Sequence, residues 1–365
     1  MKVIKVILNA LVIVLISLLA WRLIDANNKY NEVVQDSNTK INELSNEINN
    51  LKIEYEKKDC KNRNAVEKLN IKSVYGDNEA YHPKVLYFEN GWNGYKYWMA
   101  YSPYPHADDS KENPHIAVSN DLNNWKTPEG LKNPLDEISK IYKKKKIYNS
   151  DPHLVYNNDL KQLECWWRFV NDVTDQVIIY RRTSKNGVNW SNKEIILNTT
   201  RSKQDYVSPT IIYENGEYHL WYVSGGYKLN YTKSKDLKKW NETRQINLNY
   251  NNSQLMIWHF DIIHNKDYYE AVLTSFNKNE GRDKMNIYYT KSADNITWES
   301  PKLILTPSFD SKNWDNKGLY RASLLHVNNE YHVFYSGFSW TKERGIGLIS
   351  GSSIENLCYK KEINN

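Results

Sequence analysis

One segment pattern recurs five times in this chain and constrains its fold more than any other feature. Each copy has a short apolar opening run, an aromatic second run, and a third run that leads into a turn. The opening runs read YHPKVLYF (81–88), SDPHLVYN (150–157), VSPTIIYE (207–214), WHFDIIHN (258–265) and YRASLLHV (320–327). Strand-like patterning that repeats at a spacing of about 40–65 residues is typical of a β-propeller.

The second run of each copy supplies the middle of a small sheet. These runs read YKYWMAYSP (95–103), LECWWRFVN (163–171), EYHLWYVSG (217–225), YYEAVLTSF (268–276) and EYHVFYSGF (330–338). A small sheet that is apolar on both faces cannot bury both faces alone, so such sheets stack as blades around an axis. We therefore expect residues 74–365 to form an all-β, five-bladed β-propeller. An aromatic-rich β-sandwich is the alternative, but five copies in order argue against it.

Polar turn residues and a tryptophan end four of the copies. The third runs read IAVSNDLNNW (116–125), IIYRRTSKNGVNW (178–190), YTKSKDLKKW (231–240) and IYYTKSADNITW (287–298), and a degenerate LISGSSIENL (348–357) ends the fifth copy. The Asn, Asp and Gly residues before each tryptophan favour tight turns. We expect each tryptophan to fill the gap between two neighbouring blades.

The chain begins with a long apolar segment. Val3 to Ile24 is just long enough to span a bilayer of about 30 Å as a helix. Lys2 and Lys5 precede the apolar core, which favours a cytoplasmic N-terminus and an exported remainder. We interpret residues 1–25 as an uncleaved transmembrane signal anchor, which predicts a single-pass protein of the cell membrane with its propeller on the extracytoplasmic side. A cleaved signal peptide is the competing interpretation, although no clear small-x-small site follows the apolar core.

Residues 26–70 are polar, rich in Asn, Lys and Glu, and free of proline and glycine. Apolar residues recur in them at heptad spacing: Val34, Ile41, Leu44, Ile48, Leu51 and Tyr55. Such spacing favours a short coiled coil or a single helical stalk that holds the propeller off the membrane. Weak self-association through this segment is a further expectation.

The composition limits the classes of partner. The net charge of +6 is modest for 365 residues, and its densest cluster is Lys143–Lys146. A lysine-rich loop is usually a solvated surface, so we expect no nucleic-acid partner, whereas an anionic glycan fits the same charge. The cysteines Cys60, Cys165 and Cys358 are widely scattered and form neither a metal motif nor a complete disulfide framework. The 28 Tyr and 13 Trp residues suit both blade packing and sugar stacking.

Polar residues stand where the opening runs should approach the propeller axis. Alignment of the runs on their apolar pairs gives His82, Asp151, Ser208, His259 and Arg321 at one axial position. Two residues further along, on the same face of each strand, come Lys84, His153, Thr210, Asp261 and Ser323. Buried polar groups need partners or a ligand. We expect this ring to line a ligand-binding funnel, and a water-filled channel with satisfied ion pairs is the structural alternative.

The pattern resembles that of the arabinanase, levansucrase and invertase superfamily of five-bladed propellers, and of glycoside hydrolase family 43 in particular. The similarity covers about residues 74–358 and depends on Asp151-Pro152 at the head of the second opening run and on closers of the type Ser-x-Asp-Leu-x-x-Trp. It implies that carboxylates at the propeller centre cleave a glycosidic bond, one as base or nucleophile and another as general acid. Asp151 matches the acid that orients the substrate and tunes the general acid.

The chain departs from the pattern of this family at two acid positions. His82 stands where the family has an Asp, and Ser208 stands where it has a Glu. We expect Asp261 and Glu112 to serve as the working pair in their place, with Asp151 beside them; Asp205, Asp77 and Glu79 are the other candidates for a relocated acid. Substrate contacts are expected from polar residues of the funnel and from two aromatic platforms: His82, His153, Ser208, His259, Arg321, Trp92 and Trp167. No residue is assigned as a metal ligand and no cofactor is expected, although a central divalent cation such as calcium is left open.

The sequence therefore predicts a glycoside hydrolase that acts on a carbohydrate polymer or oligosaccharide at the cell envelope. A catalytically inert glycan-binding propeller or envelope scaffold protein is the alternative. A propeller that serves protein–protein assembly is a third hypothesis, which would require an exposed apolar patch.

Overall fold

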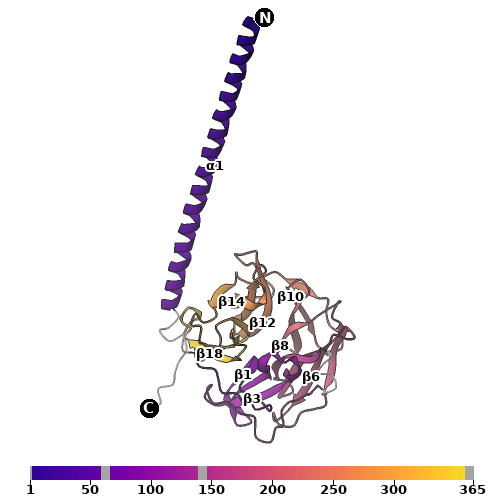
Figure 1. The fold of residues 1–365 in the computed structure, drawn as a ribbon. Coiled ribbons are helices and arrows are strands. Elements are labelled where there is room, and N and C mark those ends of the chain that lie inside the picture. The colour runs from indigo at the N-terminus through magenta and orange to yellow at the C-terminus, as the bar shows by residue number, and fades with distance from the viewer. Residues whose placement is uncertain (1, 59–65, 139–145, 358–365) are drawn as a thin grey trace. The chain divides into compact units, whose positions relative to one another are not determined.

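The computed structural model describes residues 2–58, 66–138 and 146–357 (Figure 1). The chain forms two compact units, Met1–Lys58 and Asp59–Asn365. The two cysteines Cys60 and Cys358, and most of the Lys143–Lys146 cluster, lie outside the described residues.

The first unit is a single helix, α1 (Lys2–Lys58). Its Leu11–Ser45 portion has a window of mean hydropathy 1.5, which is long and apolar enough to cross a membrane, and a signal sequence near an N-terminus would meet the same criterion. The expected apolar helix is therefore confirmed. The membrane location, its orientation and the function of residues 26–58 as a stalk stay predictions.

The second unit contains five antiparallel sheets, as the repeat predicts. The first sheet consists of β1 (Ala80–Trp92), β2 (Tyr95–Pro103) and β3 (His115–Ser119). The second consists of β4 (Ile147–Asn157), β5 (Gln162–Asn171), β6 (Gln176–Ser184) and β7 (Glu194–Thr200). The third consists of β8 (Val207–Glu214), β9 (Glu217–Ser224), β10 (Lys228–Ser234) and β11 (Arg244–Ile246). The fourth consists of β12 (Leu255–Asn265), β13 (Tyr268–Asn277), β14 (Asn286–Ser292) and β15 (Lys302–Leu305). The fifth consists of β16 (Gly318–Val327), β17 (Glu330–Phe338) and β18 (Arg344–Gly351). The order within each sheet follows the chain, so each sheet is one blade.

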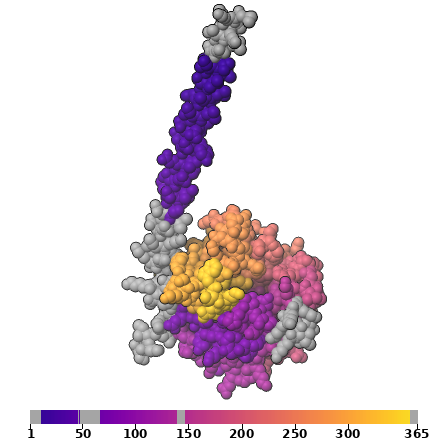
Figure 2. Space-filling model, in the orientation of Figure 1, coloured from indigo at the N-terminus to yellow at the C-terminus, as the bar shows by residue number. Residues whose placement is uncertain are grey.

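The first strands of the blades form a closed ring. Strands β1, β4, β8, β12 and β16 each contact the next in this order, and β16 contacts β1 again. In Figure 1 the labels of β1, β8 and β12 lie toward the middle of the propeller, while β3 and β6 lie toward its rim. The yellow final blade lies beside the violet first blade in Figure 2. The predicted five-bladed propeller is therefore confirmed.

The residues that precede the first blade close the ring against the last one. The Leu69 amide donates a hydrogen bond to the Ile346 carbonyl in β18 (2.8 Å), and the Trp314 indole donates to the Val66 carbonyl (3.0 Å). Residues 66–70, which the sequence places in the helical segment, therefore pack on the propeller.

The hydrophobic core lies between the blades. Each of five apolar clusters combines residues of two neighbouring blades, and together they cover every blade junction. Trp125 meets Phe334 edge-on with ring centroids 5.8 Å apart, and Trp298 meets Phe260 in the same way at 5.4 Å. The prediction that the closing tryptophans fill the gaps between blades is confirmed. Apolar burial on both faces of each sheet is what drives the ring to close.

A repeated turn holds these tryptophans in position. In the fourth blade the Asp294 carboxylate accepts hydrogen bonds from the backbone amides of Ile296 and Thr297 (2.9 and 2.7 Å), and these bonds lower the pKa of Asp294 to about 2. The indole of Trp298 then donates to the Asn295 carbonyl (3.2 Å). The Ser-x-Asp closers therefore encode a side-chain-capped turn that turns the tryptophan back into the core.

Candidate active site

A β-bulge interrupts each inner strand at the same place. The pairing register shifts between Tyr81 and Lys84, Ser150 and His153, Val207 and Thr210, Ile257 and His259, and Leu319 and Ala322. In the first three blades the bulged residue has a positive φ: His82 (53°), Asp151 (52°) and Ser208 (52°). Proline follows each of these three residues, and proline is tolerated inside a sheet at bulges because it has no N–H to pair. The bulge breaks the strict alternation of the strand and changes the direction of the axial side chains.

A pocket of about 180 Å³ opens among these axial residues. Four predicted site residues line it: His82, Glu112, Asp151 and His259. The other lining residues form an aromatic side with Tyr104, Trp258 and Tyr320, and a basic side with Arg168, Arg201 and Arg282; Asp109, Tyr148, Ser150 and Val207 complete it. Residues from the loop after β2 and from the starts of several inner strands therefore line one pocket.

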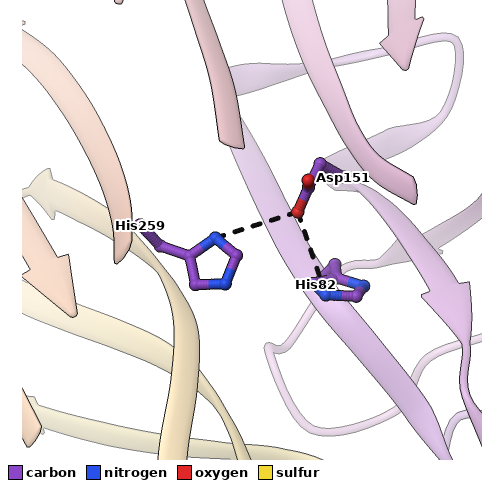
Figure 3. Close-up of side chains that lie close together, drawn as sticks. All are labelled: His82, Asp151 and His259. Atoms are coloured by element: carbon purple, nitrogen blue, oxygen red, sulfur yellow. Dashed lines mark ion pairs between the residues drawn. The ribbon is translucent and has the colours of Figure 1, made fainter. Parts of the chain in front are cut away.

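His82, Asp151 and His259 converge at the centre of this pocket (Figure 3). The Asp151 Oδ1 atom lies 3.8 Å from His82 Nε2 and 3.8 Å from His259 Nδ1. One ligand atom from each residue lies within 4.8 Å of the other two. All three side chains are at least 96% buried, with exposed fractions of 2, 4 and 2%. The residues come from β1, β4 and β12, so three separate blades build the cluster.

Several buried polar atoms of this cluster lack hydrogen bonds. Among the described residues, Asp151 Oδ1 and both ring nitrogens of His259 have no hydrogen-bond partner. His82 Nδ1 lies 2.8 Å from Ser102 Oγ, so its Nε2 is the atom that faces Asp151. Two imidazole nitrogens and one carboxylate oxygen with an open position are the ligand set of a catalytic zinc site. These residues therefore fit zinc or a similar transition metal better than calcium, which prefers oxygen ligands alone.

The electrostatics of the cluster suit the same ligand set. Burial lowers the pKa of His82 to about 4 and lowers that of His259 well below its ordinary value, so both imidazoles are neutral at pH 7. Burial by itself would raise the pKa of Asp151, but the imidazoles of His82 and His259 and the guanidinium of Arg321 hold it below its ordinary value. A metal ion binds neutral imidazole and ionised carboxylate, which are the protonation states present here.

Glu112 lies beside the cluster, and its pKa is shifted in the opposite direction to that of Asp151. Its Oε1 lies 3.5 Å from His82 Nδ1, and its side chain is buried after the short 3₁₀ helix η3 (Asp109–Lys111). Burial, and then the nearby charges of Asp109 and Asp151, raise the pKa of Glu112 well above its ordinary value. The pKa values of Glu112 and Asp151 are therefore shifted in opposite directions, which is the arrangement that divides acid and base roles.

Arg321 supports Asp151 from below. Its Nη1 lies 3.4 Å from Asp151 Oδ1, and its Nη2 lies 3.0 Å from His153 Nδ1 and donates to the Pro209 carbonyl (3.1 Å). The Ser208 amide donates to Asp151 Oδ2 (3.2 Å). Arg321, His153 and Ser208 thus surround Asp151 or its neighbours without lining the pocket. We expected these three residues to contact substrate, and the structure instead places them behind the pocket wall.

Asp261 lies deeper along the propeller axis than the residues that line the pocket. Its Oδ1 accepts a hydrogen bond from Lys84 Nζ (2.7 Å), its Oδ2 accepts one from the Leu324 amide (3.0 Å), and its side chain is 1% exposed. The expectation that Asp261 and Glu112 act together is corrected, since Asp261 does not line the pocket and its charge is neutralised by Lys84.

The two expected stacking platforms also lie elsewhere. Trp167 is 0% exposed inside the core between the first two blades, and its indole donates to Asn149 (3.1 Å). Trp92 packs edge-on against Trp98 at 4.9 Å between centroids in the same core. Neither residue lines the pocket, because Trp167 on the middle strand β5 and Trp92 at the end of the inner strand β1 both pack into the core between the first two blades. Trp258, Tyr104 and Tyr320 provide the aromatic wall instead.

A simple signal could have found part of that wall. The residues one position before the axial residues are Tyr81, Ser150, Val207, Trp258 and Tyr320, and all except Tyr81 line the pocket. The bulge brings this preceding position toward the axis together with the axial one. The arginines of the lining share no such sequence signal, because Arg168 lies on the middle strand β5 whereas Arg201 and Arg282 lie between strands.

No protein-family model matches the chain. A curated protein, the A type blood N-acetyl-alpha-D-galactosamine deacetylase of Flavonifractor plautii, is 27% identical over 303 residues, which cover 70% of this chain and 38% of that protein. The chain thus spans well under half the length of this relative.

Solved structures share the fold. The crystal structure of an N-acetylgalactosamine deacetylase from F. plautii in complex with blood group B trisaccharide has a TM-score of 0.70 at 24% identity, covering 80% of this chain and 96% of that one. An exo-1,5-alpha-L-arabinanase from a bovine ruminal metagenomic library has a TM-score of 0.54 at 13% identity, covering 74% and 93%. An exo-beta-1,3-galactanase from Phanerochaete chrysosporium has a TM-score of 0.57 at 12% identity, covering 81% and 66%. The chain is a five-bladed propeller similar in fold to enzymes that act on carbohydrates.

Proposed function

We propose that this chain is a metal-dependent amide hydrolase that removes the acetyl group from an N-acetylated sugar of a glycan. The observation that carries the proposal is the cluster of His82, Asp151 and His259, whose buried ligand atoms face one another at the centre of the pocket. The similarity to an N-acetylgalactosamine deacetylase at 27% identity supports the same reaction class.

The residues of the pocket favour amide hydrolysis over glycoside cleavage. His82 and Ser208 replace two carboxylates that a family 43 glycosidase would use, while the replacement at His82 supplies a metal ligand. A glycosidase needs an acid and a base or nucleophile across the glycosidic bond, but it needs no pair of neutral imidazoles beside the carboxylate. An amide hydrolase of the zinc type uses such a set.

The chain's own residues have distinct roles in this reaction. His82, Asp151 and His259 would hold a divalent cation, which supplies Lewis acidity toward the amide carbonyl and an activated water. As the oxygen of a water bonds to the carbonyl carbon, Glu112 is placed to give its proton to the amide nitrogen and to take one from that water, so that the C–N bond breaks to give acetate and a free amine. Trp258 and Tyr320 form an apolar wall on which a sugar ring can stack, and the Trp258 indole donates to Tyr320 Oη (2.9 Å), which fixes both rings.

Glycoside hydrolysis at the cell envelope is the second candidate. It is favoured by the opposite pKa shifts of Glu112 and Asp151, since a protonated acid beside an ionised carboxylate is also the pair that a glycosidase needs. In that case Asp151 would act as nucleophile or base, and His259 would only contact the sugar.

We also propose that α1 anchors the propeller at the outer face of the cell membrane, where envelope glycans are within reach. The apolar part of α1 supports the anchor. Residues 26–58 then act as a stalk, and the exposed Val34, Ile41 and Leu44 support weak self-association through it.

The test measures two products from one set of reactions. The full chain, purified in detergent, stripped of metal and reloaded with zinc, is incubated with oligosaccharides that contain N-acetylgalactosamine or N-acetylglucosamine. Free acetate and released sugar are both assayed for the wild type, Asp151→Asn, His259→Gln and the control His264→Gln, which lies at the other end of β12.

Release of acetate that is lost in both site variants and kept in the control supports the deacetylase. Sugar release that survives in His259→Gln but not in Asp151→Asn indicates the glycosidase. Neither product, with glycan binding intact, would indicate an inert binding module.

A further inference from the structure

Two arginines lack an acidic partner: Arg282, which lines the pocket, and Arg344, which lies over the Tyr104 ring of the pocket lining. Arg282 belongs to the short 3₁₀ helix η5 (Arg282–Lys284) of the fourth blade, and Arg344 begins β18 of the fifth blade. Across the described residues, neither guanidinium has a carboxylate within 4.0 Å. The acids next to them in sequence are bound to lysines instead: Asp283 pairs with Lys317 (3.0 Å) and Glu343 with Lys68 (2.6 Å).

Both guanidinium groups lie over rings that line the pocket. The Arg282 guanidinium carbon is 4.2 Å from the centroid of the Trp258 ring, and that of Arg344 is 4.8 Å from the Tyr104 ring. An arginine held over an aromatic face keeps its N–H groups available at its edge. Arg344 Nη1 donates to the Lys342 carbonyl (3.1 Å), whereas its buried Nε has no hydrogen-bond partner in the part of the chain that the structure describes.

The aromatic wall connects the two arginines. Tyr320 accepts the hydrogen bond of the Trp258 indole and stacks on Tyr81 with centroids 5.2 Å apart, and Arg344 lies 5.9 Å from the Tyr81 ring. The two guanidinium groups therefore lie against one continuous set of aromatic rings, Trp258, Tyr320, Tyr81 and Tyr104.

The other two arginines that line the pocket differ in this respect. Arg168 pairs with Asp205, and Arg201 pairs with Asp172 (2.6 Å) and with Asp205 (3.3 Å). Their charges are compensated within the protein. The contrast identifies Arg282 and Arg344 as the cations that are free to meet a ligand.

We propose that Arg282 and Arg344 bind an anionic group of the glycan, a carboxylate or a phosphate near the N-acetylated sugar, so that the substrate is an acidic N-acetylated glycan. Arginine presents paired donors that match either oxyanion, and charge-assisted bonds of this kind are about twice as strong as neutral ones. The inference rests on the proposed function for the acetyl group, but the anion site stands on its own contacts.

The test measures affinity separately from turnover. Calorimetry with the full chain in detergent compares three probes that carry an N-acetylhexosamine: a neutral A-type trisaccharide, an unsulfated chondroitin tetrasaccharide with uronate carboxylates, and a poly(glycerol phosphate) oligomer substituted with the sugar. Each is measured at low and high salt with wild type, Arg282→Gln, Arg344→Gln and the control Arg244→Gln, which lies on the outermost strand of the third blade.

At least one acidic probe is expected to bind about ten-fold or more tightly than the neutral one, with the gain lost in either site variant, kept in the control and reduced by salt. Whichever acidic probe shows the gain identifies carboxylate or phosphate as the anion. Equal affinity for all three probes, or a gain that persists in Arg282→Gln, overturns the inference. Arg282 is exposed, so this variant keeps the test valid even if Arg344→Gln does not fold. Acidic binding without acetate release would refute the proposed function and leave the anion site in place.

Discussion

The axis of the propeller carries two layers of buried polar residues, and they are completed in different ways. The outer layer holds His82, Asp151 and His259, and among the described residues Asp151 Oδ1 and both ring nitrogens of His259 lack hydrogen bonds. The inner layer, two residues further along the same strands, holds the Lys84–Asp261 pair and His153. Asp261 accepts from Lys84 and from a backbone amide, and His153 Nε2 lies 3.1 Å from the Ile211 amide nitrogen.

The difference between the two layers indicates that the inner layer stabilises the fold and the outer layer binds a ligand. An unpaired buried polar group costs about 1–3 kcal/mol, so a layer that serves only the fold should complete its hydrogen bonds, as the inner layer does around Asp261. The outer layer tolerates the cost at two of its side chains, Asp151 and His259, which come from two blades. Such a cost at a pocket is expected where a ligand completes the bonds. The following predictions test this division of roles, and they run from the largest expected effect to the smallest.

Breaking the inner layer should unfold the protein. Lys84→Met leaves the buried Asp261 carboxylate without its cation, and removal of one partner of a buried pair costs about 3–5 kcal/mol. Denaturant titration of the full chain should show this loss of unfolding free energy. The double variant Lys84→Met/Asp261→Leu should recover most of it, and a single variant as stable as the wild type would contradict the structural role of this layer.

Changing the outer layer should instead remove activity. His259→Gln takes away one ligand of the cluster, so we expect acetate release to fall by more than about 100-fold, beyond the effect of losing an outer-shell partner. Because neither ring nitrogen of His259 has a hydrogen-bond partner among described residues, the unfolding free energy should change by less than about 1 kcal/mol. A large destabilisation would show that the outer layer supports the fold as well.

Zinc should stabilise the wild type through the outer layer alone. At a free zinc concentration roughly thirty times its Kd, linkage predicts about 2 kcal/mol of added stability, which a chelator should reverse. Thermal unfolding with and without zinc measures the shift. The His259→Gln variant serves as the matched control, and an equal shift in that variant would place the ion elsewhere.

The smallest effect is expected from the residue that orients a ligand. Ser102 Oγ lies 2.8 Å from His82 Nδ1 and directs Nε2 toward Asp151. Loss of such a partner lowers metal affinity about ten-fold, so Ser102→Ala should weaken zinc binding by about 1.4 kcal/mol. Calorimetric titration with zinc would measure it, and an unchanged affinity would exclude His82 from the ligand set.

The fold was predictable because one repeat encodes it five times. The apolar runs and closing tryptophans specify blades independently of loop details, and Asp151, His82 and His259 follow from the same alignment. Depth along the axis was not predictable in this way. Asp261 faces the axis as its spacing indicates, but Lys84 reaches it across the axis from β1, a strand that is not adjacent to β12 in the ring.

The remaining site residues depend on contacts that no local pattern contains. Trp167 is in a strand of alternating orientation, and only the packing of the adjacent blade decides that it is buried. Arg282 lies in a loop between β13 and β14, and its position over Trp258 depends on how that loop folds back. Glu112 was found because its loop opens on the axial face, which the propeller topology fixes.

The bulges on the inner strands create axial positions that accept different types of side chain. His82, Asp151 and Ser208 have different side chains but the same backbone conformation, with φ near 52°. A carboxylate, an imidazole or a hydroxyl can thus occupy such a position without a change in the backbone of the strand. The reaction that this ring of residues supports can therefore change through single substitutions at these positions, while the fold of the blades stays the same.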